Sequence, residues 1–160
     1  MAIQLKSTGE LGNQGLKVLV YGQAGCGKTT LSKTLPKPVV LSAEGGLLSL
    51  KDDNIPYIEI KSMTDLHDAY AWLQDSDEFE SVVLDSISEI AHEKKINKDG
   101  RAAYGEMDVQ LSEIIRAFRD LDMHVLMTAK LEKQQDEMGR MLYFPSLPGN
   151  KTAQKLPYFF

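Results

Sequence analysis

The feature that most constrains the fold of this chain is GQAGCGKTT, residues 22–30, which directly follows the apolar run KVLVY, residues 17–21. A short, β-branched apolar run predicts a buried strand. The next segment, TLSKTL, has helical spacing and no breaker before Pro36. The quoted stretch is therefore expected to be a strand-to-helix turn, in which glycines let consecutive backbone N–H groups point at phosphate oxygens.

The turn fits the pattern G-x-x-x-x-G-K-[ST] of phosphate-binding loops. In this pattern Lys28 reaches the β- and γ-phosphates and has a catalytic role, while the Thr29 hydroxyl binds Mg²⁺. The alternative, a chance match in a glycine-containing turn, is disfavoured by the position between a strand and a helix. We therefore expect ATP and Mg²⁺ as cofactors. The nucleotide-binding residues would be Gly22, Gln23, Ala24, Gly25, Cys26, Gly27, Lys28, Thr29 and Thr30.

Length and composition indicate one ordinary folded domain. The chain has 160 residues, of which 42% are hydrophobic and 26% charged, and its single cysteine excludes an internal disulfide framework. The net charge of −5 argues against binding of nucleic acid through the overall field of the protein. No apolar stretch approaches the length of a membrane span. We expect a cytoplasmic protein without a membrane partner.

Strands alternate with helices along the rest of the chain. We expect strands over residues 37–46, 55–60, 80–86 and 123–129, and helices over residues 64–74, 87–95 and 106–121, with Thr64 as a helix cap. Polar residues over 1–15, 97–105 and 131–155 predict a lead and two loops. This pattern predicts an α/β fold, a single three-layer P-loop NTPase domain over residues 1–160 with a mainly parallel sheet and helices on both faces.

The chain ends on KLPYFF, an apolar segment that looks like the start of another element. Two interpretations stay open. Either the chain is a truncated product, or these aromatic side chains dock on the sheet or on a neighbouring subunit.

Polar residues at the ends of the predicted strands are the other candidates for chemistry, because ligands of parallel sheets bind at the carboxyl ends of the strands. VVLD, residues 82–85, resembles a Walker B element, in which Asp85 would hold Mg²⁺ together with Thr29. Many P-loop ATPases place a glutamate directly after that aspartate, but here the position is Ser86. We therefore expect Glu44 to activate the attacking water. The alternative for Glu44 is a solvated turn residue.

The phosphate loop, AEGG, DSISE and a strand before a long polar segment together resemble the RecA-type ATPase core. In that family the catalytic glutamate lies on the strand after the phosphate-loop helix, which matches Glu44. AEGG, AYGEM, HVLMTAK and the LPG…LPYFF ending are similar to short phage-encoded RecA-core ATPases, some of which are single-strand annealing recombinases. The resemblance covers residues 17–160. It implies a Mg²⁺-dependent ATPase that acts on single-stranded DNA in recombination or annealing, as a homo-oligomer in the host cytoplasm.

The resemblance also implies roles for further residues. RecA proper senses the γ-phosphate with a polar amide at a strand end, and at the corresponding strand end this chain has Thr128 and Lys130 as candidate sensors. Two polar loops would meet DNA through cations and aromatics, although a purely solvated role is equally open for each residue. Their members are Lys94, Lys95, Lys98, Arg101 and Tyr104 in the first loop, and Lys133, Arg140, Tyr143, Phe144, Lys151 and Lys155 in the second.

Two other functions are compatible with a phosphate loop. A small nucleotide kinase would suit the length, but kinases clamp phosphates with several grouped arginines, and the four arginines of this chain are scattered. A nucleotide-dependent assembly or loader module would act on a protein partner with little turnover. DNA-stimulated ATP hydrolysis would discriminate the recombination function from both.

Overall fold

The computed structural model describes residues 5, 7, 9, 15–93, 101–147 and 150–160, with the side chains of 92–93, 101–108 and 150–152 left out. Six strands form one sheet, in which five parallel strands have the order β1-β5-β4-β2-β3 and β6 pairs antiparallel with β5. Their bounds are β1 Lys17–Gly22, β2 Pro38–Ser42, β3 Tyr57–Glu59, β4 Ser81–Asp85, β5 His124–Gln135 and β6 Met141–Pro145. The predicted α/β fold with a mainly parallel sheet is confirmed.

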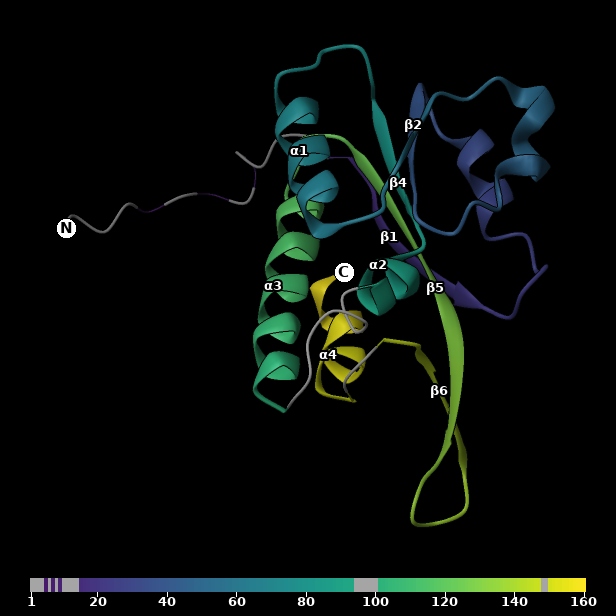
Figure 1. Ribbon diagram of the computed structural model, residues 1–160, viewed down its shortest axis with the longest axis vertical. Coiled ribbons are helices and arrows are strands. Elements are labelled where there is room, and N and C mark those ends of the chain that lie inside the picture. Colours follow the sequence, from purple (N-terminus) through teal and green to yellow (C-terminus); the bar gives the residue numbers. More distant parts are fainter. Residues whose placement is uncertain (1–4, 6, 8, 10–14, 94–100, 148–149) are drawn as a thin grey trace.

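The helices cover the two faces of the sheet unequally. One face carries α1 (Met63–Gln74), α2 (Ile87–Glu93), α3 (Arg101–Arg119), α4 (Asn150–Lys155) and the 3₁₀ helix η5 (Leu156–Phe159). Among the described residues, the other face carries two 3₁₀ helices, η2 (Thr29–Thr34) and η3 (Leu47–Asp53), so the three layers are present but one is thin (Figure 1).

Alternation along the buried strands explains the two layers. In β4, Val82 and Leu84 pack into the large core beneath the α-helices, whereas Val83 packs into the smaller core beneath η2 and η3. Successive side chains of a strand point to opposite faces. Because both faces of a central parallel strand are covered, both must be apolar. This explains the continuous apolar run of β4, in which every residue is buried.

Three predictions about helices are wrong, and they concern the type of one helix and the first residues of two others. The segment after the phosphate loop is the six-residue 3₁₀ helix η2 and not an α-helix. Helix α1 begins at Met63, and its cap is Ser62 instead of Thr64, because the Ser62 hydroxyl accepts a hydrogen bond from the Asp65 N–H. Helix α3 begins at Arg101, so residues 101–105 belong to a helix and not to a loop.

The predicted long loop over residues 131–155 is also wrong. Strand β5 continues to Gln135 and pairs with β6 as a hairpin, whose turn is closed by a hydrogen bond from the Asp136 N–H to the Arg140 carbonyl. The hairpin extends beyond the edge of the helical layer (Figure 1). Helix α4 follows within the same segment.

The apolar end of the chain packs on the domain. Leu156 is fully buried in the large core, and the guanidinium of Arg116 lies 4.4 Å from the ring centroid of Phe159. Arg119 donates a hydrogen bond to the Phe159 carbonyl. Of the aromatic side chains in KLPYFF, Phe159 packs against α3, whereas Tyr158 and Phe160 are exposed, at 88% and 36%.

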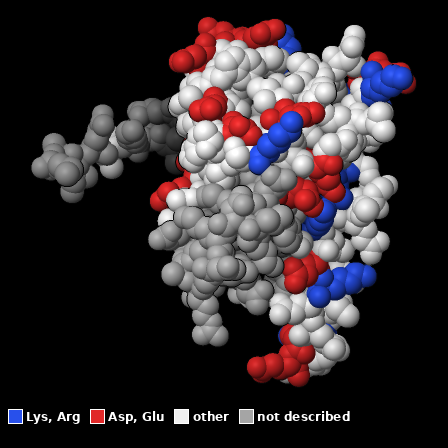
Figure 2. All heavy atoms as spheres, viewed as in Figure 1, with Lys and Arg blue, Asp and Glu red and all other residues white. Residues whose placement is uncertain are grey.

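The described surface carries charges of both signs. On the face drawn in Figure 2, acidic and basic side chains are interspersed, without a continuous basic patch. Within the described part of the chain, no helix is both long and apolar enough to cross a membrane.

Candidate functional site

Residues 23–28 connect β1 to η2 as a glycine-dependent loop. Gly25 and Gly27 have φ values of +75° and +93°, a region that L-residues with a Cβ rarely adopt. At Gly22, an added Cβ would lie 2.7 Å from the Cys26 sulfur. The glycines of the motif therefore serve the backbone conformation of the loop, as its phosphate-binding pattern requires.

The Lys28 side chain folds back over this loop. Its Nζ donates hydrogen bonds to the carbonyl oxygens of Gly22, at 3.0 Å, and Gln23, at 2.8 Å, and lies 3.9 Å from the Cys26 sulfur. An ammonium group has three donors. Two strong acceptors thus hold the positive charge at the loop, and the remaining donor is directed at the weak sulfur acceptor, which a phosphate oxygen would outcompete.

The Asp85 carboxylate is the centre of the described polar contacts at the strand ends. It is 1% exposed, at the last position of β4. Thr29 donates a hydrogen bond to its Oδ2 at 2.7 Å, and Thr128 donates one to its Oδ1 at 2.5 Å. The peptide bond that follows Asp85 is cis.

The alternation of side chains along β4 and β5 explains why Asp85 and Thr128 meet. Asp85 lies on the same face of β4 as Val83, and Thr128 lies on the same face of β5 as Leu126, and this is the face covered by η2 and η3. Thr29 is the first residue of η2. The end of β4, Thr128 of β5 and the phosphate loop therefore meet on the face of the sheet that η2 and η3 cover.

The Thr29 and Asp85 pair fits a magnesium ion. A hydroxyl and a carboxylate supply the hard oxygen ligands that Mg²⁺ prefers, and Mg²⁺ usually takes only one or two protein ligands beside water and phosphate. Both oxygens are present within 2.7 Å of each other. When bound there, the ion would neutralise charge on the phosphate oxygens.

Glu44 lies two residues beyond β2, whose end is joined to β4 by a hydrogen bond of 2.8 Å from the Ala43 N–H to the Asp85 carbonyl. The Glu44 carboxylate is 3.6 Å from the Nζ of Lys130, which also makes a short ion pair with Glu89. The hydrogen bond with Glu89, followed by the charge of Glu44, raises the pKa of Lys130 above its ordinary value. Two residues predicted separately, Glu44 and Lys130, are thus in contact.

Sequence reasoning missed Glu89 and Ser88. Ser88 accepts a hydrogen bond from the Lys130 N–H at 2.9 Å and donates one to the Ser146 carbonyl at 2.6 Å. The Ser146 N–H in turn donates to the Lys130 carbonyl at 2.6 Å. The available signal was DSISE, because residues at the start of the helix after Asp85 must lie near the ends of the neighbouring strands.

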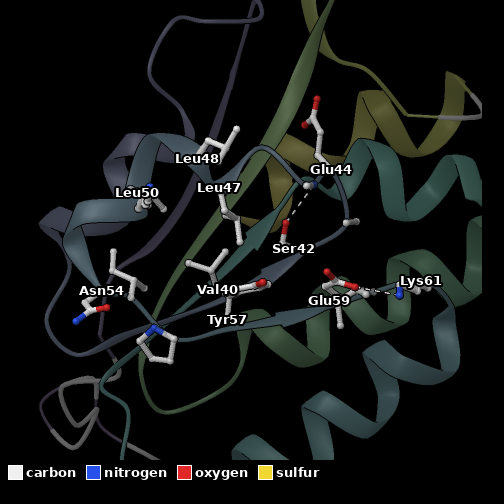
Figure 3. A pocket seen from close by; sticks show the side chains of 16 residues that line it. Val40, Ser42, Glu44, Leu47, Leu48, Leu50, Asn54, Tyr57, Glu59 and Lys61 are labelled. Carbon is white, nitrogen blue, oxygen red and sulfur yellow. Dashed lines mark hydrogen bonds and ion pairs between the residues drawn. The ribbon is translucent and has the colours of Figure 1, made fainter.

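A cavity of about 1020 Å³ lies beside Glu44 on the η3 side of β2 and β3. Its apolar lining includes Val40, Leu47 and Leu50, and Glu44 stands at its rim with the carboxylate turned away from that lining (Figure 3). Glu59 and Lys61 line another part of it and pair with each other at 3.0 Å.

The predicted DNA contacts are only partly described. Lys133 lies on β5 with its Nζ 5.8 Å from the ring centroid of Tyr143, while Arg140 pairs with Asp136 at 2.8 Å in the hairpin turn. Phe144 lies on β6, and Lys155 ends α4. Lys94, Lys95 and Lys98 lie outside the described residues, as do the side chains of Arg101, Tyr104 and Lys151. Side chains can therefore be placed only for the second predicted DNA loop, and most of these lie on the β5–β6 hairpin.

A family model described as an AAA domain matches residues 14–160. The chain belongs to the AAA domain family. No curated protein matches it. Membership and the parallel sheet together make this AAA domain a P-loop NTPase of the nucleotide-binding ATPase class. The narrower resemblance to phage recombinases stays a prediction.

Proposed function

We propose that this AAA domain hydrolyses ATP with Mg²⁺ and couples hydrolysis to single-stranded DNA, in annealing or strand pairing of the phage recombination type, as a homo-oligomer. One observation carries the proposal. Strand β5 contains Thr128, which contacts Asp85, and continues without interruption to Lys133 in the exposed hairpin. At about 3.3 Å per residue, a single strand connects the candidate site to a surface roughly 17 Å away.

The chemistry follows from the residues of the site. The loop N–H groups and Lys28 bind the phosphates, and Thr29 and Asp85 hold the ion. Glu44 accepts a proton from water, whose oxygen bonds to the γ-phosphorus while the bond from this phosphorus to the ADP oxygen breaks. Inorganic phosphate and ADP leave. Positioning and electrostatic stabilisation supply most of the rate acceleration.

The β5–β6 hairpin has side chains that suit the binding of single-stranded DNA. Tyr143 is 52% exposed, with the Lys133 ammonium near its ring. An exposed aromatic ring stacks on any base, worth about 1–3 kcal/mol per base, and a nearby cation binds the adjacent phosphate.

The first experiment measures ATP hydrolysis with Mg²⁺, with and without single-stranded DNA, at low and moderate salt. We expect DNA to stimulate turnover and the stimulation to fade with salt, because phosphate contacts weaken as counterions compete. Turnover that DNA does not change at either salt concentration would exclude the DNA function and leave the ATPase.

Variants then locate the contact. Tyr143→Ala should reduce DNA stimulation and DNA affinity roughly tenfold, through loss of a stacked base, with basal turnover unchanged. Tyr158→Ala is the matched control, because Tyr158 is also an exposed tyrosine, at 88%, but lies in η5. Equal effects of the two variants would argue against the hairpin.

A second function, assembly or loading of a protein partner, is favoured by the cavity beside Glu44. Leu48 and Tyr57 line this cavity and are exposed apolar side chains, of the kind that protein partners cover. Nucleotide-dependent binding or oligomer size, without DNA stimulation, would support it.

A further inference from the structure

Lys130 is held between two carboxylates at the end of the sheet. Its Nζ pairs with Glu89 on α2 and, at 3.6 Å, with Glu44. Since β4 lies between β5 and β2 in the sheet, the ion pair between Lys130 on β5 and Glu44 after β2 joins two strands that are not neighbours. The two ion pairs together link β5 to α2 and to the segment after β2.

The backbone of Lys130 is fixed independently of its side chain. Its register partner on β1 is Gly22, the first glycine of the phosphate loop. Its N–H and carbonyl are bound by Ser88 and Ser146. With the main chain fixed, the position of the flexible ammonium depends on its two carboxylate partners.

The two partners are unequal. Glu89 makes the shorter contact, and its side chain is 28% exposed against 39% for Glu44. Glu89 is also the first cause of the raised pKa of Lys130. A carboxylate that is closer and less solvated holds the ammonium more firmly than an exposed one at 3.6 Å.

We propose that Glu89 is a positioning residue, which holds the Lys130 ammonium in the place where this ammonium orients the Glu44 carboxylate for water activation. The inference rests on the proposed hydrolysis of ATP. Glu89 itself touches neither nucleotide nor water in this role and acts only through Lys130.

The test is a double-mutant cycle on ATP turnover. Glu89→Gln keeps the shape of the side chain and removes its charge, so kcat should fall about 10- to 100-fold through misplacement of Lys130 and Glu44, with KM for ATP unchanged. Glu89→Asp should recover part of this loss. In a Lys130→Met background, Glu89→Gln should cost nothing further. Glu113→Gln, an exposed glutamate of α3, is the control and should leave kcat unchanged.

Two outcomes would overturn the inference while leaving ATP hydrolysis intact. One is a Glu89→Gln variant with normal kcat and only a lower melting temperature, which a purely structural ion pair would give. The other is an additive double mutant, which would mean that Glu89 acts by a path other than Lys130.

A second readout needs no turnover. The rate of Lys130 acylation by an amine-reactive ester, followed by mass spectrometry in the full chain, should rise severalfold in Glu89→Gln, because the freed ammonium loses its proton more readily. Lys61, paired with Glu59, is the internal control and should keep its rate. If the wild-type protein shows no hydrolysis, the proposed function fails, and unchanged Lys130 labelling would separately overturn the positioning by Glu89.

Discussion

Thr29 donates a hydrogen bond of 2.7 Å to Asp85, although 56 positions separate the two residues in the chain. The hydroxyl comes from the phosphate-loop side and the carboxylate from the end of β4. The two oxygens expected to bind Mg²⁺ therefore lie side by side, where one ion could contact both.

Replacement of Asp85 by asparagine should remove Mg²⁺-dependent hydrolysis. The amide keeps the size of the side chain but supplies no negative charge for the ion, so we expect turnover to fall by about 100-fold or more. Turnover measured against Mg²⁺ concentration checks this. Asp75→Asn, at the exposed end of α1, should change nothing. Full activity of Asp85→Asn at ordinary Mg²⁺ would contradict the assignment.

Replacement of Lys28 by methionine should abolish nucleotide binding or hydrolysis. The Lys28 ammonium is held over the loop by two carbonyl oxygens, and methionine supplies no charge for the phosphates. Binding of a fluorescent ATP analogue measures the loss. Lys33→Met is the control, because Lys33 lies in η2, the helix that follows Lys28, but pairs with Asp53 at 3.8 Å. If Lys28→Met matched the wild type in both nucleotide affinity and ATP turnover, the phosphate-loop role would be excluded.

The parts of the fold that sequence predicted were those with strong local patterns. Continuous apolar runs identified β2, β4 and the start of β5, because central parallel strands are buried on both faces. These runs also predicted that Asp85 and Thr128 lie near the ends of their strands. The two residues can touch because β4 and β5 are neighbours in the sheet.

The missed parts depend on contacts that no local pattern encodes. The β5–β6 hairpin is exposed on both faces, so Gln134 and Gln135 show no alternation that would predict a strand. The pairing of Glu89 with Lys130 joins residues 41 positions apart. Only the three-dimensional structure brings such a pair together.

The cap of α1 gives a test of stability. Ser62 and Thr64 are both good capping residues by type, but only the Ser62 hydroxyl caps, and the Asp65 carboxylate reciprocates by accepting from the Lys61 N–H. Ser62→Ala should therefore lower the free energy of unfolding by about 1 kcal/mol, and Thr64→Ala should lower it much less. Urea denaturation of both variants measures the difference. A larger loss in Thr64→Ala would contradict the assigned cap.

Glu44→Gln should separate binding from chemistry. The amide keeps the shape of the side chain but cannot accept a proton from water, so hydrolysis should fall by about 10²- to 10⁴-fold, while affinity for ATP stays close to that of the wild type. A rapid-quench measurement of phosphate release, together with nucleotide binding, gives both numbers. Glu59→Gln is the matched control, because Glu59, the last residue of β3, lines the same cavity but pairs with Lys61. If Glu44→Gln hydrolysed ATP at the normal rate, Glu44 would be a solvated turn residue, and the base would have to be sought elsewhere among the carboxylates at the strand ends.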